Sequence, residues 1–227
     1  MSQATDNHPD STDSNQYPVK TIYVFGLLTI LSTMLVWANN EFVMTKEIFR
    51  ALAGNTQNSF RVDMQYETVR RMNDWGYVFA PVQTTLRIGF VALIVQMTCL
   101  LGGKEIPFGR IFRISAIAFG ATLFGSLLQI FWIVRQPVTA ITQASLGIVP
   151  DSMAAWLSTT SAAPSLLYLL LSRVSITSLL WMLLLYWGLL ETNRLRWFGA
   201  ATATAVTWCI ANAVQIGASL FVRELVS

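Results

Sequence analysis

Five long apolar runs recur along the chain, and polar stretches separate them. Each run is close to or longer than the roughly 20 apolar residues with which a helix crosses the hydrocarbon core of a bilayer. Strands of a membrane barrel would instead alternate over segments of about 10 residues. The pattern predicts an all-α fold, a polytopic membrane helical bundle with five transmembrane helices. The predicted spans cover residues 21–38, 77–101, 114–134, 165–190 and 197–222.

The first 19 residues differ from the rest of the chain. Residues 1–19 are polar, carry three aspartates and two prolines, and have no hydrophobic period. Such a segment cannot bury enough apolar surface to offset its ordering entropy, so the sequence predicts a disordered tail. A signal peptide is not expected, because the basic start and the small-residue cleavage site are missing. Residues 20–227 are then expected to form one membrane domain.

Two connectors are long enough to carry structure of their own. In residues 39–76 the charges cancel and apolar residues recur at helical spacing, which predicts two short interfacial helices at 42–53 and 60–75. A helical hairpin packed on the ends of the bundle fits this pattern equally well. In residues 135–164 prolines alternate with apolar positions, which favours a half-inserted or interfacial segment.

Basic residues in the short turns suggest an orientation. Lys104, Arg110 and Arg113 follow the second span, and Arg194 and Arg196 follow the fourth. Both turns lie on the same side as the N-terminus in a five-span arrangement. Because basic residues favour the cytoplasmic side, we expect the N-terminus inside and the C-terminus outside.

Composition narrows the function classes. The chain is 54% hydrophobic and only 12% charged, against about 25% charged in soluble domains. Its net charge of +3 is spread out, so no nucleic-acid partner is expected. The one histidine, His8, lies in the tail, and Cys99 and Cys209 are predicted to be buried fillers inside apolar runs. No intramembrane haem or histidine metal site is therefore available, and no cofactor is predicted.

Two charged residues interrupt the predicted spans. Arg87 lies in the second span and Arg173 in the fourth, and the other three spans contain no charge. An uncompensated charge at membrane depth costs at least ~2.5–3.5 kcal/mol on insertion scales, which makes such residues candidates for function. The pair could bind an anion or a lipid headgroup, or form a paired gate. Alternatively, both spans start later and the guanidinium groups reach back to the membrane interface.

Small residues and amides indicate where helices meet. Small residues four apart let helix backbones approach closely, within one bundle or between membrane proteins, including copies of this chain. The pairs are Ala116 with Gly120, Ala121 with Gly125, Gly199 with Ala203, and Ala201 with Ala205. Four polar residues in the spans could bond between helices at about 0.6 kcal/mol each. They are Gln96, Gln129, Asn212 and Gln215.

The order of motifs over residues 78–222 resembles the Yip-domain family, membrane proteins named for interaction with Ypt and Rab GTPases. The chain shares with this family an apolar helix, a Gly-rich basic turn and an entry to the next helix at Pro107, Phe108 and Phe112. It also has a Trp and a Gly in a later helix, Trp181 and Gly188. The tail is short, and Ser175 stands where many members carry Asp or Asn, which favours a bacterial-type member. The resemblance implies a five-span domain with a cytoplasmic N-terminus, expected in a bacterial inner membrane, with no established activity.

These observations support one main functional hypothesis and two alternatives. The main one is a non-enzymatic membrane protein of Yip-like fold, acting as a scaffold, a lipid-organising factor or a partner subunit. Its expected partners are membrane lipids and another membrane protein or a second copy. The first alternative is a transporter or channel-like component that uses Arg87 and Arg173. A lipid-modifying enzyme ranks last, because the spans contain no catalytic set.

Overall fold

The computed structural model describes residues 16–53, 59–138, 141, 150–156 and 166–226. In this part of the chain every regular element is a helix, and one isolated bridge joins Ser152 to Ser175. The elements are α1 (Gln16–Ala38), η2 (Asn39–Val43), α2 (Lys46–Ala53), α3 (Ser59–Leu101), α4 (Phe108–Val134), α6 (Met153–Trp156), α7 (Leu166–Arg173), α8 (Ile176–Glu191) and α9 (Trp197–Val226).

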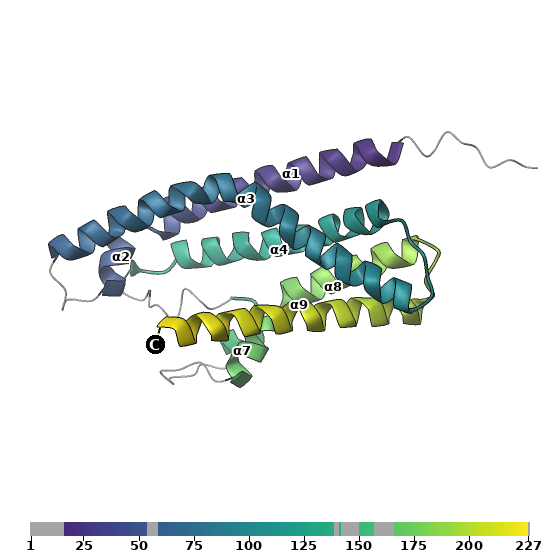
Figure 1. The fold of residues 1–227 in the computed structure, drawn as a ribbon. Coiled ribbons are helices and arrows are strands. Elements are labelled where there is room, and N and C mark those ends of the chain that lie inside the picture. Colours follow the sequence, from purple (N-terminus) through teal and green to yellow (C-terminus); the bar gives the residue numbers. More distant parts are fainter. Residues whose placement is uncertain (1–15, 54–58, 139–140, 142–149, 157–165, 227) are drawn as a thin grey trace, which may run out of the picture.

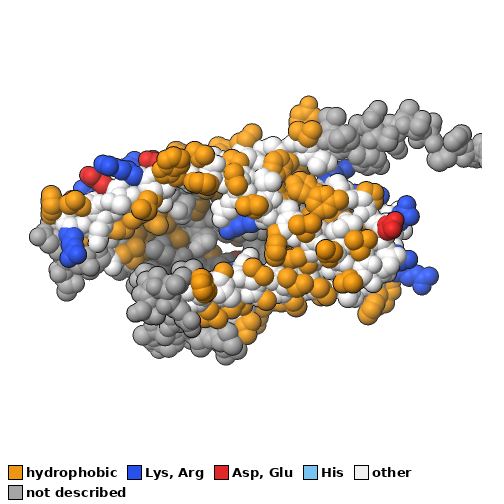
Figure 2. Space-filling model, viewed as in Figure 1, with side chains coloured by type: hydrophobic (Ala, Val, Ile, Leu, Met, Phe, Trp, Pro, Cys, Tyr) orange, Lys and Arg blue, Asp and Glu red, His pale blue; other side chains and the backbone are white. Residues whose placement is uncertain are grey.

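Among the described residues, three stretches are helical, long and apolar enough to cross a membrane. They are Thr21–Val43, Phe60–Leu101 and Phe108–Val134. Large apolar side chains also cover much of the surface of the bundle (Figure 2). The all-helical fold and the membrane character predicted from the sequence are thus confirmed. The helix α8 is also apolar, but its 16 residues are shorter than a full crossing.

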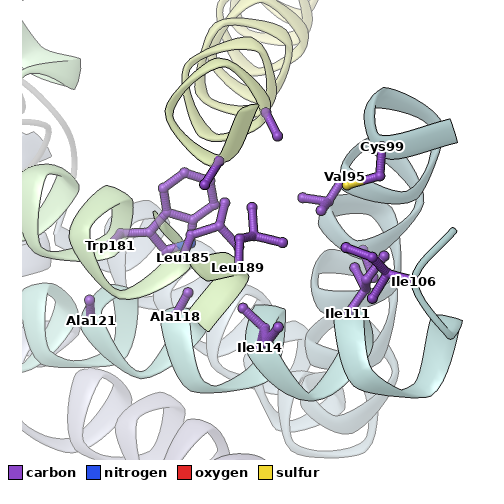
Figure 3. Packing of buried hydrophobic residues seen from close by; sticks show 13 residues of the cluster. Val95, Cys99, Ile106, Ile111, Ile114, Ala118, Ala121, Trp181, Leu185 and Leu189 are labelled. Carbon is purple, nitrogen blue, oxygen red and sulfur yellow. The ribbon is translucent and has the colours of Figure 1, made fainter. Parts of the chain in front are cut away.

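Helix α4 occupies the centre of the bundle. It packs against α1, α3 and α8, and α9 packs against α3 and α8 (Figure 1). The main core lies among α3, α4, α8 and α9. In Figure 3, Leu185 and Leu189 of α8 point into the space between these helices, with Ile114 and Val95 facing them. Cys99 is buried in the same core, whereas Cys209 is exposed on a face of α9, so its predicted burial was wrong.

The bundle has two distinct ends. The start of α1, the turn between α3 and α4 and the turn between α8 and α9 lie together at one end (Figure 1). Arg110 Nη2 donates to the Glu191 carbonyl at 2.9 Å, which joins the two basic turns directly. We call this the basic-turn end, and the opposite end, where α9 finishes, the C-terminal end. The side of the membrane that each end faces stays a prediction.

Three predicted boundaries were wrong. Gln16–Val19, assigned to the tail, form the first turn of α1, and the preceding residues lie outside the described part. Residues 46–53 do form a short helix, α2, but 60–75 belong to α3, a continuous helix of 43 residues. The prediction placed a break at Gly76, yet a Cβ there would lie 3.4 Å from Val36 Cγ1. That glycine lies inside α3 beside α1 and does not end the helix, and a Cβ there would make an ordinary van der Waals contact.

The fourth predicted span, 165–190, is interrupted. Helix α7 ends at Arg173 and α8 begins at Ile176, so two shorter helices replace one. The polar residues Ser172, Arg173 and Ser175 stand at the interruption. The third and fifth predicted spans correspond to α4 and α9, each extended at one end. The connector 135–164 lies mostly outside the described residues, so its predicted insertion is not addressed.

Helix α3 changes direction about midway along its length (Figure 1), and Pro81 lies in this middle part. Proline lacks the backbone N–H that would bond to residue 77, and its ring crowds that carbonyl, which bends helices. The N-terminal half of α3 accompanies α1 and α2, and the C-terminal half crosses toward α9 (Figure 1). This bend opens space between α3 and α9 in the middle of the bundle.

Candidate functional site

A cavity of about 730 Å³ lies between α3, α4, α9 and the junction of α7 with α8. We call it the arginine cavity, because Arg87 and Arg173 both line it. The other polar residues that line it are Gln83, Ser115, Thr122, Ser126, Gln129, Ser172, Ser175, Thr177, Ser178, Asn212 and Gln215. Figure 2 shows a hollow midway along this face, with atoms of a basic side chain at its rim. The cavity is therefore open on the side of the bundle that carries apolar side chains.

The two arginines predicted as a site are brought together on this cavity. Arg87 is exposed and, in the described part of the chain, makes no hydrogen bond or ion pair. Arg173 is half-buried, and its Nη1 donates to Gln215 Oε1 at 2.6 Å. Its guanidinium thus points toward α9.

Both arginines lie well away from the basic-turn end of the bundle. Arg87 lies about 14 residues before the end of α3, or roughly 21 Å from the basic-turn end at 1.5 Å per residue. The 16 residues of α8 place Arg173 about 24 Å from the same end. The two residues thus lie at similar depth. In a hydrocarbon core of about 30 Å, these depths leave about 9 Å and about 6 Å to the C-terminal end, where both predicted spans begin, so a guanidinium group that reaches that interface stays an alternative.

Two buried polar atoms on residues lining the cavity have no partner in the described part of the chain. They are Nε of Arg173 and Oγ of Ser115. Ser115 is 1% exposed and lies on α4. A buried donor without a partner costs about 1–3 kcal/mol, so the walls of the cavity contain two unsatisfied polar atoms.

The junction between α7 and α8 is held by a capping network. Ser175 Oγ accepts from the Ser178 amide at 3.0 Å, and Ser178 Oγ accepts from the Ser175 amide at 3.0 Å. Asp151 Oδ2 accepts from the Thr177 amide at 2.8 Å. These bonds satisfy the first amides of α8, and the carboxylate complements the positive end of the helix dipole.

Sequence reasoning did not single out Asp151 as part of the site. It comes from a connector far from α8 in the sequence, and only the bridge between Ser152 and Ser175 brings it to the helix start. The break itself had a local signal. The pair Ser175 and Ser178 has the three-residue spacing of a capping box inside an otherwise apolar run.

The four predicted interhelical amides have different roles. Gln215 does bond between helices, with Arg173, whereas Asn212 Nδ2 donates to the Trp208 carbonyl of its own helix at 2.8 Å. Together with Gln129 these two line the arginine cavity. Gln96 lies elsewhere, and its Oε1 is buried without a partner among the described residues.

The small-residue pairs on α4 are used within one chain. Gly120 faces Leu28 of α1, and a Cβ at Gly125 would lie 3.1 Å from Thr177 of α8. A Cβ at Gly188 would lie 2.5 Å from Ile114, so this glycine lets α8 approach α4. On α9, Ala203 is buried whereas Ala205 is exposed. Of the predicted pairs, only Ala201 with Ala205 has an exposed member, which is Ala205 on α9.

The chain matches no family model, no curated protein and no solved structure. The resemblance to the Yip-domain family therefore stays a prediction, and function has to be argued from the cavity.

Proposed function

We propose that this chain is an integral membrane protein that binds the phosphate of an anionic lipid headgroup in the arginine cavity, in a non-enzymatic, lipid-organising role. In this proposal α1, α3, α4, the pair α7 and α8, and α9 make five crossings of a bacterial inner membrane, with the N-terminus in the cytoplasm. A Yip-like fold and association with another membrane protein or a second copy remain part of the same hypothesis.

The observation that carries the proposal is the pair of arginines on one cavity. Guanidinium groups present several donors in a plane and bind phosphate oxygens well. The described lining offers these two cations with amides and hydroxyls, and no carboxylate. An anion would offset the charges of Arg87 and Arg173.

The position of the opening favours a lipid over a soluble anion. The hollow lies midway along an apolar face (Figure 2), where a lipid could enter sideways. Leu86, Phe90 and Val214 are exposed and line the same cavity, so an acyl chain would find an apolar wall beside the headgroup. Binding is favoured over catalysis because the polar groups on the lining are guanidinium, amide and hydroxyl groups.

Lipid retention tests this proposal. The protein is placed in nanodiscs of phosphatidylcholine with one fifth phosphatidylglycerol, and bound lipid is counted by native mass spectrometry after release. We expect the native chain to retain phosphatidylglycerol and the double variant Arg87→Leu, Arg173→Leu to retain at least about tenfold less, because each lost charge-assisted bond is worth about 1.5–3 kcal/mol. Equal retention by both proteins would overturn the proposal.

A matched control separates specific binding from general charge. Arg194→Leu removes an exposed arginine at the basic-turn end and should leave retention unchanged. A second arm adds inorganic phosphate to nanodiscs of phosphatidylcholine alone and follows thermal unfolding. Stabilisation by phosphate without retention of phosphatidylglycerol would assign the site to a soluble anion, and the transporter-like alternative would then replace the lipid-organising role.

A further inference from the structure

A second cavity continues from the arginine cavity toward the C-terminal end. Its volume is about 440 Å³, and it lies between α1, η2, α3 and α4. We call it the asparagine cavity, because Asn39, Asn40 and Asn73 line it. Both cavities share Gln83, Arg87, Thr122 and Ser126 on their linings. Arg87 therefore stands between the two spaces.

A small third cavity extends the series. Its volume of about 40 Å³ is enough for a water molecule, and it shares Asn40 and Asn73 with the asparagine cavity. Arg70 lines it and lies 3.9 Å from Glu41 in an exposed ion pair. The three cavities thus lead from the lateral opening, past Arg87, to charged and solvated residues near α2.

The backbone at the far end of α1 is unusual in the same place. Asn39–Val43 form a π-helix, in which the Met44 amide donates to the Asn39 carbonyl at 2.9 Å. Short π-helical segments occur frequently at functional sites because they change the direction of side chains. Here the segment supplies Asn39, Asn40 and Val43 to the cavity lining. Asn40 Nδ2 donates to Tyr77 Oη at 3.3 Å across to α3.

We infer that the three cavities form one polar path that connects the anion site at membrane depth with the aqueous phase at the C-terminal end. This inference rests on the proposed function and adds a direction of access: water and small anions can reach Arg87 from the solution at that end. Arg87 is the cation at the inner end of the path and has neutral amides beside it, whereas the mouth carries Arg70 together with Glu41 and Asp74. A preference for anions over cations therefore rests on Arg87.

The opposite direction is closed by packing. Beyond Arg87 toward the basic-turn end, α3 presents Ala92, Val95 and Cys99, each 2% exposed or less. These residues belong to the main core with Ala200 and Ala203 of α9 (Figure 3). Among the described residues, the path therefore opens toward the C-terminal end and is blocked toward the basic-turn end.

Cysteine accessibility tests the path without depending on lipid binding. In a background with Cys99→Ala and Cys209→Ala, single cysteines replace Asn73, Gln83 and Ser126, and the protein is held in nanodiscs of phosphatidylcholine. The probes are the anionic 2-sulfonatoethyl and the cationic 2-(trimethylammonium)ethyl methanethiosulfonates. Modification is followed by intact-mass spectrometry, and each variant is first checked for a native elution volume and unfolding temperature.

We expect the anionic probe to modify Ser126→Cys at least about tenfold faster than Phe124→Cys, which lies on the same helix and lines none of the three cavities. Ala92→Cys, in the closed core, should stay unmodified. Adding Arg87→Leu should lower the ratio of anionic to cationic rates at Ser126→Cys about tenfold. The same comparison at Gln83→Cys keeps the test valid if Ser126→Cys does not fold.

Two results would overturn the path. One is modification at Ser126→Cys and Gln83→Cys no faster than at Phe124→Cys, and the other is a rate ratio that does not respond to Arg87→Leu. Neither result changes lipid retention in the native chain, so the path can fail while the proposed function stands. If the native chain retained no phosphatidylglycerol while Ser126→Cys and Gln83→Cys were modified as expected, the result would be the reverse: a water-filled anion path without a lipid site.

Discussion

Helices α3 and α9 meet in two different ways along their length. At the basic-turn end they touch through Ala92, Val95, Ala200 and Ala203, which are almost fully buried. Midway along the bundle the same helices are separated by the arginine cavity, where long polar residues replace the small ones. Small residues let backbones approach and close the bundle, whereas long polar side chains hold it open. The side chains on these two helices therefore decide where the bundle is tightly packed and where it contains a cavity.

The two regions also contribute oppositely to stability. Each large apolar side chain buried at the tight end gains roughly 1.5–3 kcal/mol relative to exposure. The middle region carries Arg87 without a partner and a buried Arg173 Nε and Ser115 Oγ without partners among the described residues. Proteins depart from such packing and pairing rules mainly at functional sites. The contrast is the physical reason for placing function in the middle of the bundle.

The largest expected effect comes from opening the tight region. Leu185→Ala removes a side chain that is 0% exposed between α4, α8 and α9 and should destabilise the protein by about 2–5 kcal/mol. Unfolding temperature in detergent measures this loss. Leu183→Ala, two residues away and 53% exposed, is the control and should have a much smaller effect. Equal losses for both variants would mean that the region is not a packed core.

The sequence predicted the two arginines because a charge is conspicuous inside an apolar run. It could not predict that Arg87 and Arg173 share one cavity, since that depends on how α3 bends and crosses α9. Gly76 was taken as the end of a connector, although it lies inside α3 beside Val36 of α1. Helix packing over 40 residues overrides local signals of this kind.

The break in the fourth predicted span also depends on residues that are distant in the sequence. Ser175 and Ser178 were visible as polar residues, yet 26 continuous and mostly apolar positions favoured one uninterrupted helix. Asp151, on a distant connector, accepts a hydrogen bond from the Thr177 amide at the start of α8. No local sequence pattern predicts such a partner. Elements made by neighbouring residues could be predicted, whereas those that need a partner from elsewhere in the chain could not.

An intermediate effect is expected at the α7–α8 junction, where the cavity meets its supporting helix. Ser175→Ala removes the side-chain oxygen that accepts from the Ser178 amide and should cost about 1 kcal/mol. Thermal unfolding and amide exchange over the first turn of α8 would report it. Ser126→Ala is the control, because that hydroxyl bonds only to the Thr122 carbonyl of its own helix at 3.2 Å. No difference between the two variants would contradict a capping role.

The smallest effect is expected at the C-terminal end, where α2 packs on the N-terminal half of α3. Asp63 Oδ1 accepts from Arg50 Nε at 3.0 Å, and Asp63 Oδ2 lies 2.9 Å from Lys46 Nζ. The hydrogen bond from Arg50, followed by the one from Lys46, holds the pKa of Asp63 below its ordinary value. In the unfolded chain this carboxyl titrates near pH 3.9. Its contribution to folding is therefore complete above about pH 4 and is lost as the pH falls through the lower pKa of the folded state.

Amide exchange of residues 46–53, corrected for the intrinsic rate, should consequently rise roughly two- to fivefold between pH 6 and pH 2.5, because exposed ion pairs contribute little. Residues 114–126 of α4 contain no titratable side chain and should keep the same protection at both values. Asp63→Asn should give the faster exchange of α2 already at pH 6 and remove the dependence on pH. If the native chain protected α2 equally at both values, the three charges would not hold α2 on α3. The packing of α2 on α3 would then depend on apolar contacts such as that of Phe49 with Tyr66.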